Sequence, residues 1–293
     1  MVRRGLVVER HRRHVTVEDD SGARWLCGTA NRRLQPIVAD DVHWRLEPDG
    51  TGVVTEVLER RTILTRIDSR GRCELVAANL TQLVVVVAPV PEPDWLVVDR
   101  YLVAAELAGL SALVVMNKAD LAEPPVDHLD CYRRAGYPVH VTSVTDGLGM
   151  AALARALRGE RSALVGQSGV GKSSLLNALL GDEVQDTGGL AKGAHGRHTT
   201  SSAVLYRLAS GGELVDSPGV RAYAPYIEEP GSIQKGFPEF RELIDRCRFD
   251  DCRHLAEPDC AVKEALEAGE ICKRRYDSYL RLYELVKTLI PRW

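Results

Sequence analysis

The sequence predicts a multi-domain chain whose three parts belong to different fold classes: an all-β barrel, a central α/β domain and a mostly α-helical C-terminal domain. Three observations support this division. Short alternating apolar runs separated by turn residues fill residues 1–72, long apolar segments surround a glycine-rich loop in residues 78–225, and three cysteines lie close to a histidine in residues 226–293. A chain of 293 residues is long enough for two or three such domains.

The N-terminal part is expected to be a small barrel of the OB kind, a fold that commonly binds oligonucleotides. Its strands are expected at Gly5–Val8, His14–Val17, Ala23–Cys27, Asp41–Trp44 and Gly52–Leu58. Arginines are frequent between Arg3 and Arg33, and they fit two interpretations equally: a face that follows a phosphate backbone, or an ordinary solvated surface. Trp25 and Trp44 occupy strand positions, which favours core packing over stacking on bases.

The central part is organised around Gly166-Gln-Ser-Gly-Val-Gly-Lys-Ser-Ser174, which lies between an apolar strand and an apolar helix. A phosphate-binding loop requires this strand–loop–helix context. Backbone N–H groups and the helix N-terminus would bind a polyphosphate, while Lys172 would contact its β- and γ-phosphates and Ser173 would bind Mg²⁺. The predicted nucleotide-binding residues of this loop are Gly166, Ser168, Gly169, Val170, Gly171, Lys172, Ser173 and Ser174.

Around this loop, strands are expected over 80–88, 111–116, 138–141, 163–165, 204–208 and 212–215, with helices over 94–108 and 150–157. Asn117-Lys-Ala-Asp120 stands at the carboxyl end of one strand, where open α/β sheets bind ligands. Asp120 can accept hydrogen bonds from the guanine N1–H and amine, donors that adenine lacks, while Asn117 and Lys118 would brace the loop and cover the base. At the next strand end, the region of Ser143 fits either a backbone contact with guanine O6 or a plain turn.

Two later segments have the composition of the switches of a GTPase. Residues 185–202 are polar and glycine-rich, and a threonine there would reach both the γ-phosphate and Mg²⁺. Thr199 and Thr200 are the candidates, and the sequence alone does not choose between them. Asp216 is expected beside Mg²⁺ and Gly219 at the γ-phosphate.

The motifs occur in the order base loop, phosphate loop, switches, which is a circular permutation of the usual order. Val220 stands where Ras-like enzymes carry the glutamine that orients the attacking water, so unaided hydrolysis is expected to be slow. His198 is the nearest replacement, and it fits either a catalytic residue or a solvated loop histidine. The candidate catalytic residues are therefore Lys172, Thr200 and His198.

The C-terminal part contains a set of four soft ligands in a short, turn-rich stretch. Cys247, Cys252, His254 and Cys260 are typical of a closed structural Zn²⁺ site. Helices are expected over 236–246, 260–268 and 273–289. The basic residues of the last helix fit either a binding face or a solvated surface.

The seven cysteines are an odd number, and no export signal is visible, so we expect a cytoplasmic, reduced chain without disulfides. Cys27 and Cys73 are expected to be buried or half-buried thiols, and the sequence assigns no role to Cys131 or Cys272. The longest apolar runs are too short to span a membrane. The net charge of −3 means that any basic surface must be local.

Taken together, the motifs resemble the ribosome small-subunit-dependent GTPase A family (RsgA/YjeQ-type circularly permuted GTPases). The resemblance covers nearly the full chain and is carried by Ala77–Asn79, Asp99–Leu102, Asn117–Asp120, Gly166–Ser174, Gly196–Thr200, Asp216–Arg221 and Cys247…Cys260. It implies an OB-fold domain, a GTPase domain and a zinc domain, and binding to the small ribosomal subunit and its rRNA late in maturation. It also implies GTP hydrolysis stimulated by the subunit, with His198 as a catalytic residue. The run of threonines after this histidine breaks at Ser201 and Ser202, which leaves the Mg²⁺-binding threonine open.

The main hypothesis is a GTP-hydrolysing assembly factor that acts as a monomer, with Mg²⁺, one Zn²⁺ ion, GTP or GDP, and the rRNA of the small subunit as its ligands, and no membrane partner. One alternative is a GTPase of membrane or metal traffic, which the lack of a visible membrane anchor disfavours. The other alternative is an RNA-binding switch gated by GTP, in which hydrolysis is incidental.

Overall fold

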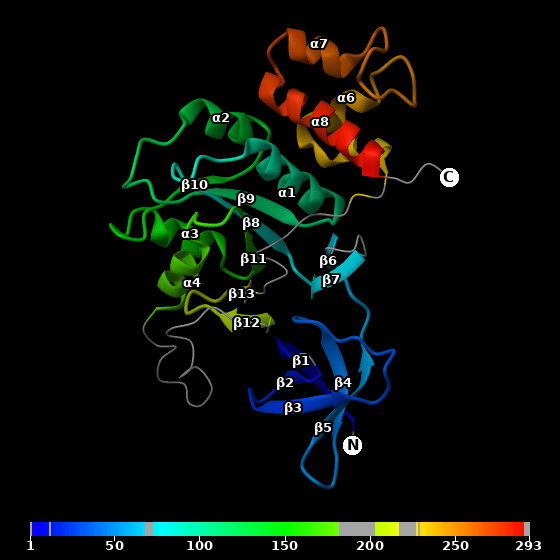
Figure 1. The fold of residues 1–293 in the computed structure, drawn as a ribbon, viewed down its shortest axis with the longest axis vertical. Coiled ribbons are helices and arrows are strands. Elements are labelled where there is room, and N and C mark those ends of the chain that lie inside the picture. Colours follow the sequence, from blue (N-terminus) through cyan, green and yellow to red (C-terminus); the bar gives the residue numbers. More distant parts are fainter. Residues whose placement is uncertain are drawn as a thin grey trace. The chain divides into compact units, whose positions relative to one another are not determined.

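The computed structural model describes residues 2–11, 13–67, 73–181, 203–216, 227 and 229–289 (Figure 1). The chain divides into two compact units, each described here by itself. The first unit comprises residues 1–82, 150–165 and 172–223, and the second comprises residues 83–149, 166–171 and 224–293.

The first unit begins with a closed five-stranded barrel, as the sequence predicts. Its strands are β1 (Arg3–Arg10), β2 (Val15–Asp19), β3 (Arg24–Thr29), β4 (Asp41–Leu46) and β5 (Gly52–Val57). Strand β1 pairs with both β2 and β4, β2 pairs with β3, and β5 pairs with both β3 and β4, which closes the ring. Only the β3–β5 pair is parallel among these five.

Two glycines make room for the core of this barrel. A Cβ on Gly5 would lie 2.4 Å from Val17 Cγ1 and 2.9 Å from Trp44 Nε1, and one on Gly52 would lie 2.3 Å from Cys27 Sγ. Trp44 is fully buried in the core. Trp25 is half-buried and packs against the same cluster. The prediction of core packing for both tryptophans is confirmed.

The remaining elements of the first unit are the hairpin β6 (Ile63–Ile67) and β7 (Cys73–Ala78), helices α3 (Met150–Ala156) and α4 (Lys172–Leu180), and strands β11 (Arg161–Val165), β12 (Ala203–Arg207) and β13 (Glu213–Asp216). The sequence did not predict the β6–β7 hairpin, and Cys73 in it is exposed rather than buried. Strand β13 pairs in parallel with β11 and antiparallel with β12. The carboxyl ends of β11 and β13 therefore lie at the same edge of the sheet.

The second unit contains the strand order β10-β9-β8, formed by β8 (Gln82–Val87), β9 (Ser111–Met116) and β10 (Val139–Val141). All residues of β8 are buried, as its continuous apolar sequence predicts. Helix α1 (Trp95–Leu107) begins after Asp94, whose side chain accepts hydrogen bonds from the N–H groups of Leu96 and Val97. Helix α2 (Val126–Arg134) was not predicted, because it buries only three side chains and its sequence is mostly polar.

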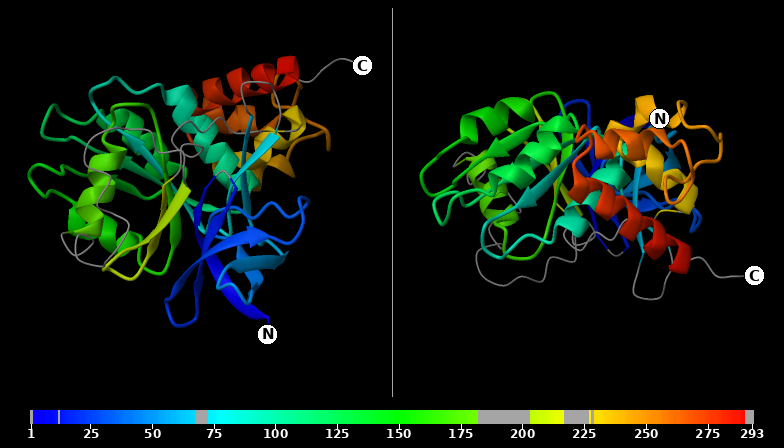
Figure 2. Two further views of the ribbon diagram at one scale, coloured as in Figure 1. Left: turned by 60° about the horizontal axis from the view of Figure 1, so that its bottom comes forward. Right: turned by 90° about the horizontal axis from the view of Figure 1, so that it is seen from above.

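The C-terminal part of this unit contains the 3₁₀ helices η3 (Pro230–Gly236) and η4 (Pro238–Phe240) and the helices α6 (Arg241–Ile244), α7 (Ala261–Glu267) and α8 (Lys273–Leu289), which Figure 2 shows from two further directions. The last two confirm their predictions. The helix predicted over 236–246 is wrong, because Pro238 holds Phe237 in an extended conformation and leaves only short helical turns.

One covalent link corrects the prediction of a chain without disulfides. Cys131 in α2 and Cys272, one residue before α8, form a disulfide between positions 141 residues apart in the sequence. The odd cysteine count gave no guidance, because three cysteines belong to the C-terminal ligand set and Cys27 and Cys73 are single thiols. Among the described residues, no helix combines the length and the apolar character that crossing a membrane requires.

Candidate nucleotide and metal sites

Within the second unit, the base loop (Asn117–Asp120) contacts the phosphate loop (Gly166–Gly171) directly. The Asn117 side-chain amide donates a hydrogen bond of 2.9 Å to the carbonyl of Val170, and Lys118 Nζ donates one of 2.5 Å to the carbonyl of Gly169. Asn117 is buried, and its oxygen accepts a hydrogen bond of 3.2 Å from Thr142 Oγ1. These contacts fix the base loop and the phosphate loop against each other.

Glycine is required at two positions of the phosphate loop. Gly166 has a φ of +143°, and a Cβ there would lie 2.1 Å from the carbonyl oxygen of Val86. Gly171 has a φ of +93°, and its Cβ would lie 2.4 Å from the side-chain nitrogen of Asn117. Both positions combine a left-handed backbone with a close approach, so any larger residue would push the phosphate loop away from β8 or from the base loop.

The loop between β8 and α1 supports the same site, which the sequence did not reveal. Gln167 Oε1 accepts a hydrogen bond of 3.1 Å from the Asp94 N–H, and Lys118 Nζ donates one of 3.3 Å to the carbonyl of Val90. The Cβ position of Gly169 lies 3.5 Å from Pro91. Val90 and Asp94 take part through their backbone atoms, which are the same in almost every residue type. The sequence therefore gave no sign that these two residues support the site.

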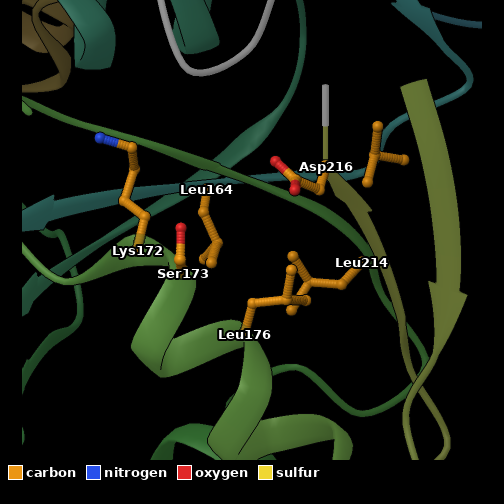
Figure 3. Close-up of a pocket in the computed structure, with 7 residues that line it drawn as sticks. Leu164, Lys172, Ser173, Leu176, Leu214 and Asp216 are labelled. Atoms are coloured by element: carbon orange, nitrogen blue, oxygen red, sulfur yellow. The ribbon is translucent and has the colours of Figure 1, made fainter. Parts of the chain in front are cut away.

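In the first unit, the predicted Mg²⁺ ligands Ser173 and Asp216 line one small pocket together with Lys172. Ser173 lies in the first turn of α4 and Asp216 ends β13, and Figure 3 shows both oxygen-bearing side chains at the same end of the pocket. The parallel pairing of β11 with β13 brings them together, because it aligns the two strand ends that precede the phosphate loop and the second switch.

The predicted base contacts differ in burial. Asp120 is exposed at the end of the base loop, whose left-handed Lys118 has a φ of +59°. Ser143 is buried, its N–H donates to the carbonyl of Leu148 at 3.0 Å, and its hydroxyl bonds Asp146. The contacts of Asp120 and Ser143 with guanine stay predictions. His198, Thr199, Thr200 and Gly219 lie outside the described residues, so their assignments stay predictions as well.

The four residues of the C-terminal ligand set converge. Their ligand atoms all lie within 4.8 Å of one another, and three of the four side chains are buried. His254 Nδ1 is 3.6 Å from Cys247 Sγ, 3.4 Å from Cys252 Sγ and 3.3 Å from Cys260 Sγ. Burial raises the pKa of the Cys252 thiol to about 12, so a cation is needed to hold this sulfur as a thiolate near neutral pH.

Helix α8 holds the metal-ligand loop in place, a contribution that the sequence did not reveal. Tyr276 donates a hydrogen bond of 2.5 Å to the carbonyl of His254, and Tyr279 donates one of 2.6 Å to the carbonyl of Arg253. His254 itself has a left-handed backbone with a φ of +56°. The backbone of the ligand set is therefore fixed by side chains of the following helix.

Two arginines of α8 point inward rather than to solvent. Arg275 is fully buried and pairs with Asp99 at 2.8 Å and with Glu239 at 2.7 Å, while Arg274 pairs with Asp99 at 2.7 Å. Although burial opposes it, the carboxylates of Glu239 and Asp99 raise the pKa of Arg275. Arg274 and Arg275 thus do not contribute to a basic binding face.

Comparison with known proteins gives similarities over the whole chain. Residues 57–225 match the family described as RsgA GTPase. The chain is 42% identical over 297 residues to the "Small ribosomal subunit biogenesis GTPase RsgA" of Sodalis glossinidius (strain morsitans), covering 96% of this chain and 85% of that protein. It is 44% identical over 285 residues to the protein of the same name from Azotobacter vinelandii, covering 94% and 83% of the two chains.

Two solved structures are similar over their full length. The crystal structure of YjeQ from Thermotoga maritima has a TM-score of 0.78 at 35% identity, with all of both chains covered. That of YloQ, described as a circularly permuted GTPase, has a TM-score of 0.76 at 29% identity and covers 100% of this chain and 98% of that one. The permuted motif order of the sequence therefore has solved counterparts.

Proposed function

We propose that this chain, which belongs to the RsgA GTPase family and is a GTP hydrolase, acts in the late maturation of the small ribosomal subunit. The observation that carries the nucleotide chemistry is the pair of hydrogen bonds from Asn117 and Lys118 to the phosphate loop, which makes one site out of the base and phosphate loops. The names of the relatives support the ribosomal role.

In this proposal, Asp120 selects guanine and the backbone N–H groups of residues 166–171 bind the phosphates. Lys172 contacts the β- and γ-phosphates, and Ser173 and Asp216 hold Mg²⁺ with Thr200. Mg²⁺ supplies neutralisation of the phosphate charge when it is bound. Thr199 and Gly219 donate backbone N–H groups to the γ-phosphate.

Hydrolysis requires water to attack the γ-phosphorus while the bond to the β–γ bridging oxygen breaks, which yields GDP and phosphate. Val220 has no polar group that could orient this water. His198 fills this role in our proposal, once binding of the small subunit brings it to the water. The subunit thus acts as the activator, and hydrolysis gives the signal for release.

The proposed domains are an OB-fold RNA-binding domain over 1–72, a permuted GTPase domain over 78–225 and a zinc-binding helical domain over 226–293. The ring of strand pairs in the barrel, with its single parallel β3–β5 contact among the five strands, supports the OB assignment. The arginines between Arg3 and Arg33 supply the RNA-facing charge. We propose that the chain acts in the cytoplasm, because its proposed partner, a maturing ribosomal subunit, is found in that compartment. We also propose that it acts as a monomer.

We assign the C-terminal ligand set to one structural Zn²⁺ ion. The ligand atoms of Cys247, Cys252, His254 and Cys260 all lie within 4.8 Å of one another, so these four residues would be able to hold a single ion between them. Three thiolates and an imidazole favour zinc over harder ions, and four protein ligands leave no open position.

The ribosomal role predicts that small subunits accelerate GTP hydrolysis. We expect single-turnover hydrolysis to rise by about 10²-fold or more when purified small subunits are added, because the catalytic side chain is then supplied to the site. His198→Ala and Thr200→Ala should keep GTP affinity and lose this stimulation, whereas the matched control His195→Ala, in the same segment, should keep it. Rapid-quench measurement with and without subunits checks this.

A rate unchanged by subunits would remove the ribosomal assignment. If GTP instead strengthens binding to the subunit while hydrolysis stays slow in its presence, the chain is the GTP-gated RNA-binding switch. Stimulation by lipid vesicles but not by subunits would favour the alternative of membrane traffic.

A further inference from the structure

The disulfide between Cys131 and Cys272 joins two segments of the second unit, one next to the base loop and one next to the metal-ligand loop. Cys131 lies in α2, which follows the base loop and precedes the strand that leads to Ser143. Cys272 lies between α7 and α8, twelve residues after Cys260, the last residue of the metal-ligand stretch. The bond thus ties an element of the base-binding region to the helix that holds the metal-ligand loop.

Non-covalent contacts hold the same two segments together beside the bond. The guanidinium of Arg274, two residues after Cys272, lies 4.7 Å from the ring centre of Tyr132, the residue after Cys131. The same arginine pairs with buried Asp99 of α1 at 2.7 Å. Because these contacts do not involve the sulfurs, they keep the two cysteines close to each other when the bond is open.

The surroundings of the two sulfurs differ in a way that suits thiol–disulfide exchange. Cys272 is half-buried, whereas Cys131 is only 7% exposed, so an incoming thiol reaches Cys272 first. Arg134 Nη2 lies 3.8 Å from Cys131 Sγ. A guanidinium at this position stabilises the thiolate that leaves when the bond breaks, although the carboxylates of Asp127 and Asp130 lie on the same helix face.

We propose that Cys131 and Cys272 form a reversible redox site that exchanges with low-molecular-weight thiols and disulfides. A thiolate attacks Cys272 Sγ, a mixed disulfide forms, and the electron pair of the broken bond leaves on Cys131 beside Arg134. A second thiolate releases Cys272, so that the disulfide and two thiols become two cysteine thiols and one small disulfide. Oxidation by a small disulfide follows the reverse path, and it locks α2 to α8.

Reversibility depends on the ion pair and ring contact of Arg274, which set the effective concentration of one thiol at the other. In the reduced state, α2 and the start of α8 stay in contact through Arg274 and through Arg275, whose guanidinium lies 5.7 Å from the ring centre of Tyr132. In the oxidised state, the covalent bond prevents the two segments from separating. Reduction therefore leaves α2 and the start of α8 joined by non-covalent contacts only, and oxidation adds a covalent link between them.

The test is a redox titration of the full chain with its zinc, equilibrated in mixtures of glutathione and glutathione disulfide and trapped by alkylation. Peptide mass spectrometry should show the Cys131–Cys272 pair converting between dithiol and disulfide in one two-electron transition. If both cysteines stay alkylated in the most oxidising mixture, or stay bonded in the most reducing one, the proposal is overturned. This titration needs no variant, no GTP and no ribosome, so it is independent of the proposed function.

Two variants of α8 test whether the contacts of Arg274 favour the disulfide over the dithiol. Arg274→Met should shift the equilibrium toward the dithiol by roughly tenfold, because the thiols lose their enforced proximity. The matched control Arg281→Met, an exposed position of α8, should leave the equilibrium unchanged. Equal titrations of both variants would overturn the assignment of Arg274, and Arg134→Gln should slow reduction severalfold if Cys131 is the leaving group.

Discussion

Asp120→Asn is expected to change the base preference from guanine to xanthine. In the proposed site, the carboxylate of Asp120 would accept from the N1–H and the exocyclic amine of guanine, whereas xanthine carries a carbonyl in place of that amine. An asparagine amide can accept from N1–H and donate to this carbonyl, so the variant matches xanthine and leaves the guanine amine opposite a donor. A site that loses such a polar match rejects the wrong ligand by about 10⁴-fold.

Binding calorimetry with GTP and XTP on the wild type and the variant measures this exchange. The fold should tolerate the change, because Asp120 is exposed and the base loop is held by Asn117 and Lys118 rather than by residue 120. Asp130→Asn, on nearby α2, is the matched control and should keep the preference for GTP. If Asp120→Asn binds GTP as tightly as the wild type does, residue 120 does not select the base.

Removal of the metal is expected to unfold the C-terminal ligand loop and to loosen α8. Structural Zn²⁺ sites of this kind contribute about 10–16 kcal/mol of binding free energy near neutral pH, which is as large as the whole stability of a typical domain, about 5–15 kcal/mol. Cys252→Ser removes a buried ligand, and the loop then loses the geometry that presents the His254 carbonyl to Tyr276. Hydrogen exchange in residues 247–282 should rise strongly in this variant.

Zinc content measured by elemental analysis, together with hydrogen exchange, separates this effect from the loss of any cysteine. The control Cys73→Ser removes an exposed thiol and should keep one zinc ion per chain and the wild-type protection. The account of the metal site fails if Cys252→Ser also retains one equivalent of zinc and full protection of α8.

Local patterns predicted most of the elements that carry the site. The five barrel strands and the strands of the α/β part follow from apolar alternation and from buried apolar runs, because these signals depend on neighbouring residues only. The base loop and the phosphate loop were each recognised from a short motif, but the hydrogen bonds from Asn117 and Lys118 to the phosphate loop are a finding of the structure.

The errors have one local cause and two that involve distant segments. Pro238, within the helix predicted over 236–246, drives the residue before it into an extended conformation, a local signal that the prediction did not use. In the sequence, Arg274 and Arg275 have the pattern of a polar helix face. In the structure, they form ion pairs with the carboxylates of Asp99 and Glu239, which lie far away in the sequence. The Cys131–Cys272 bond joins positions 141 residues apart, and no spacing rule covers such a pair.

The central claim is that one site, built from the base loop and the phosphate loop, binds a guanine nucleotide. The most direct measurement is a competition experiment in which GTP and ATP displace a fluorescent GDP analogue from the purified chain in the presence of Mg²⁺. Because Asp120 matches donors that adenine lacks, we expect GTP to compete at least about 10³-fold more strongly than ATP. Equal competition by the two nucleotides, or stronger competition by ATP, would contradict the account.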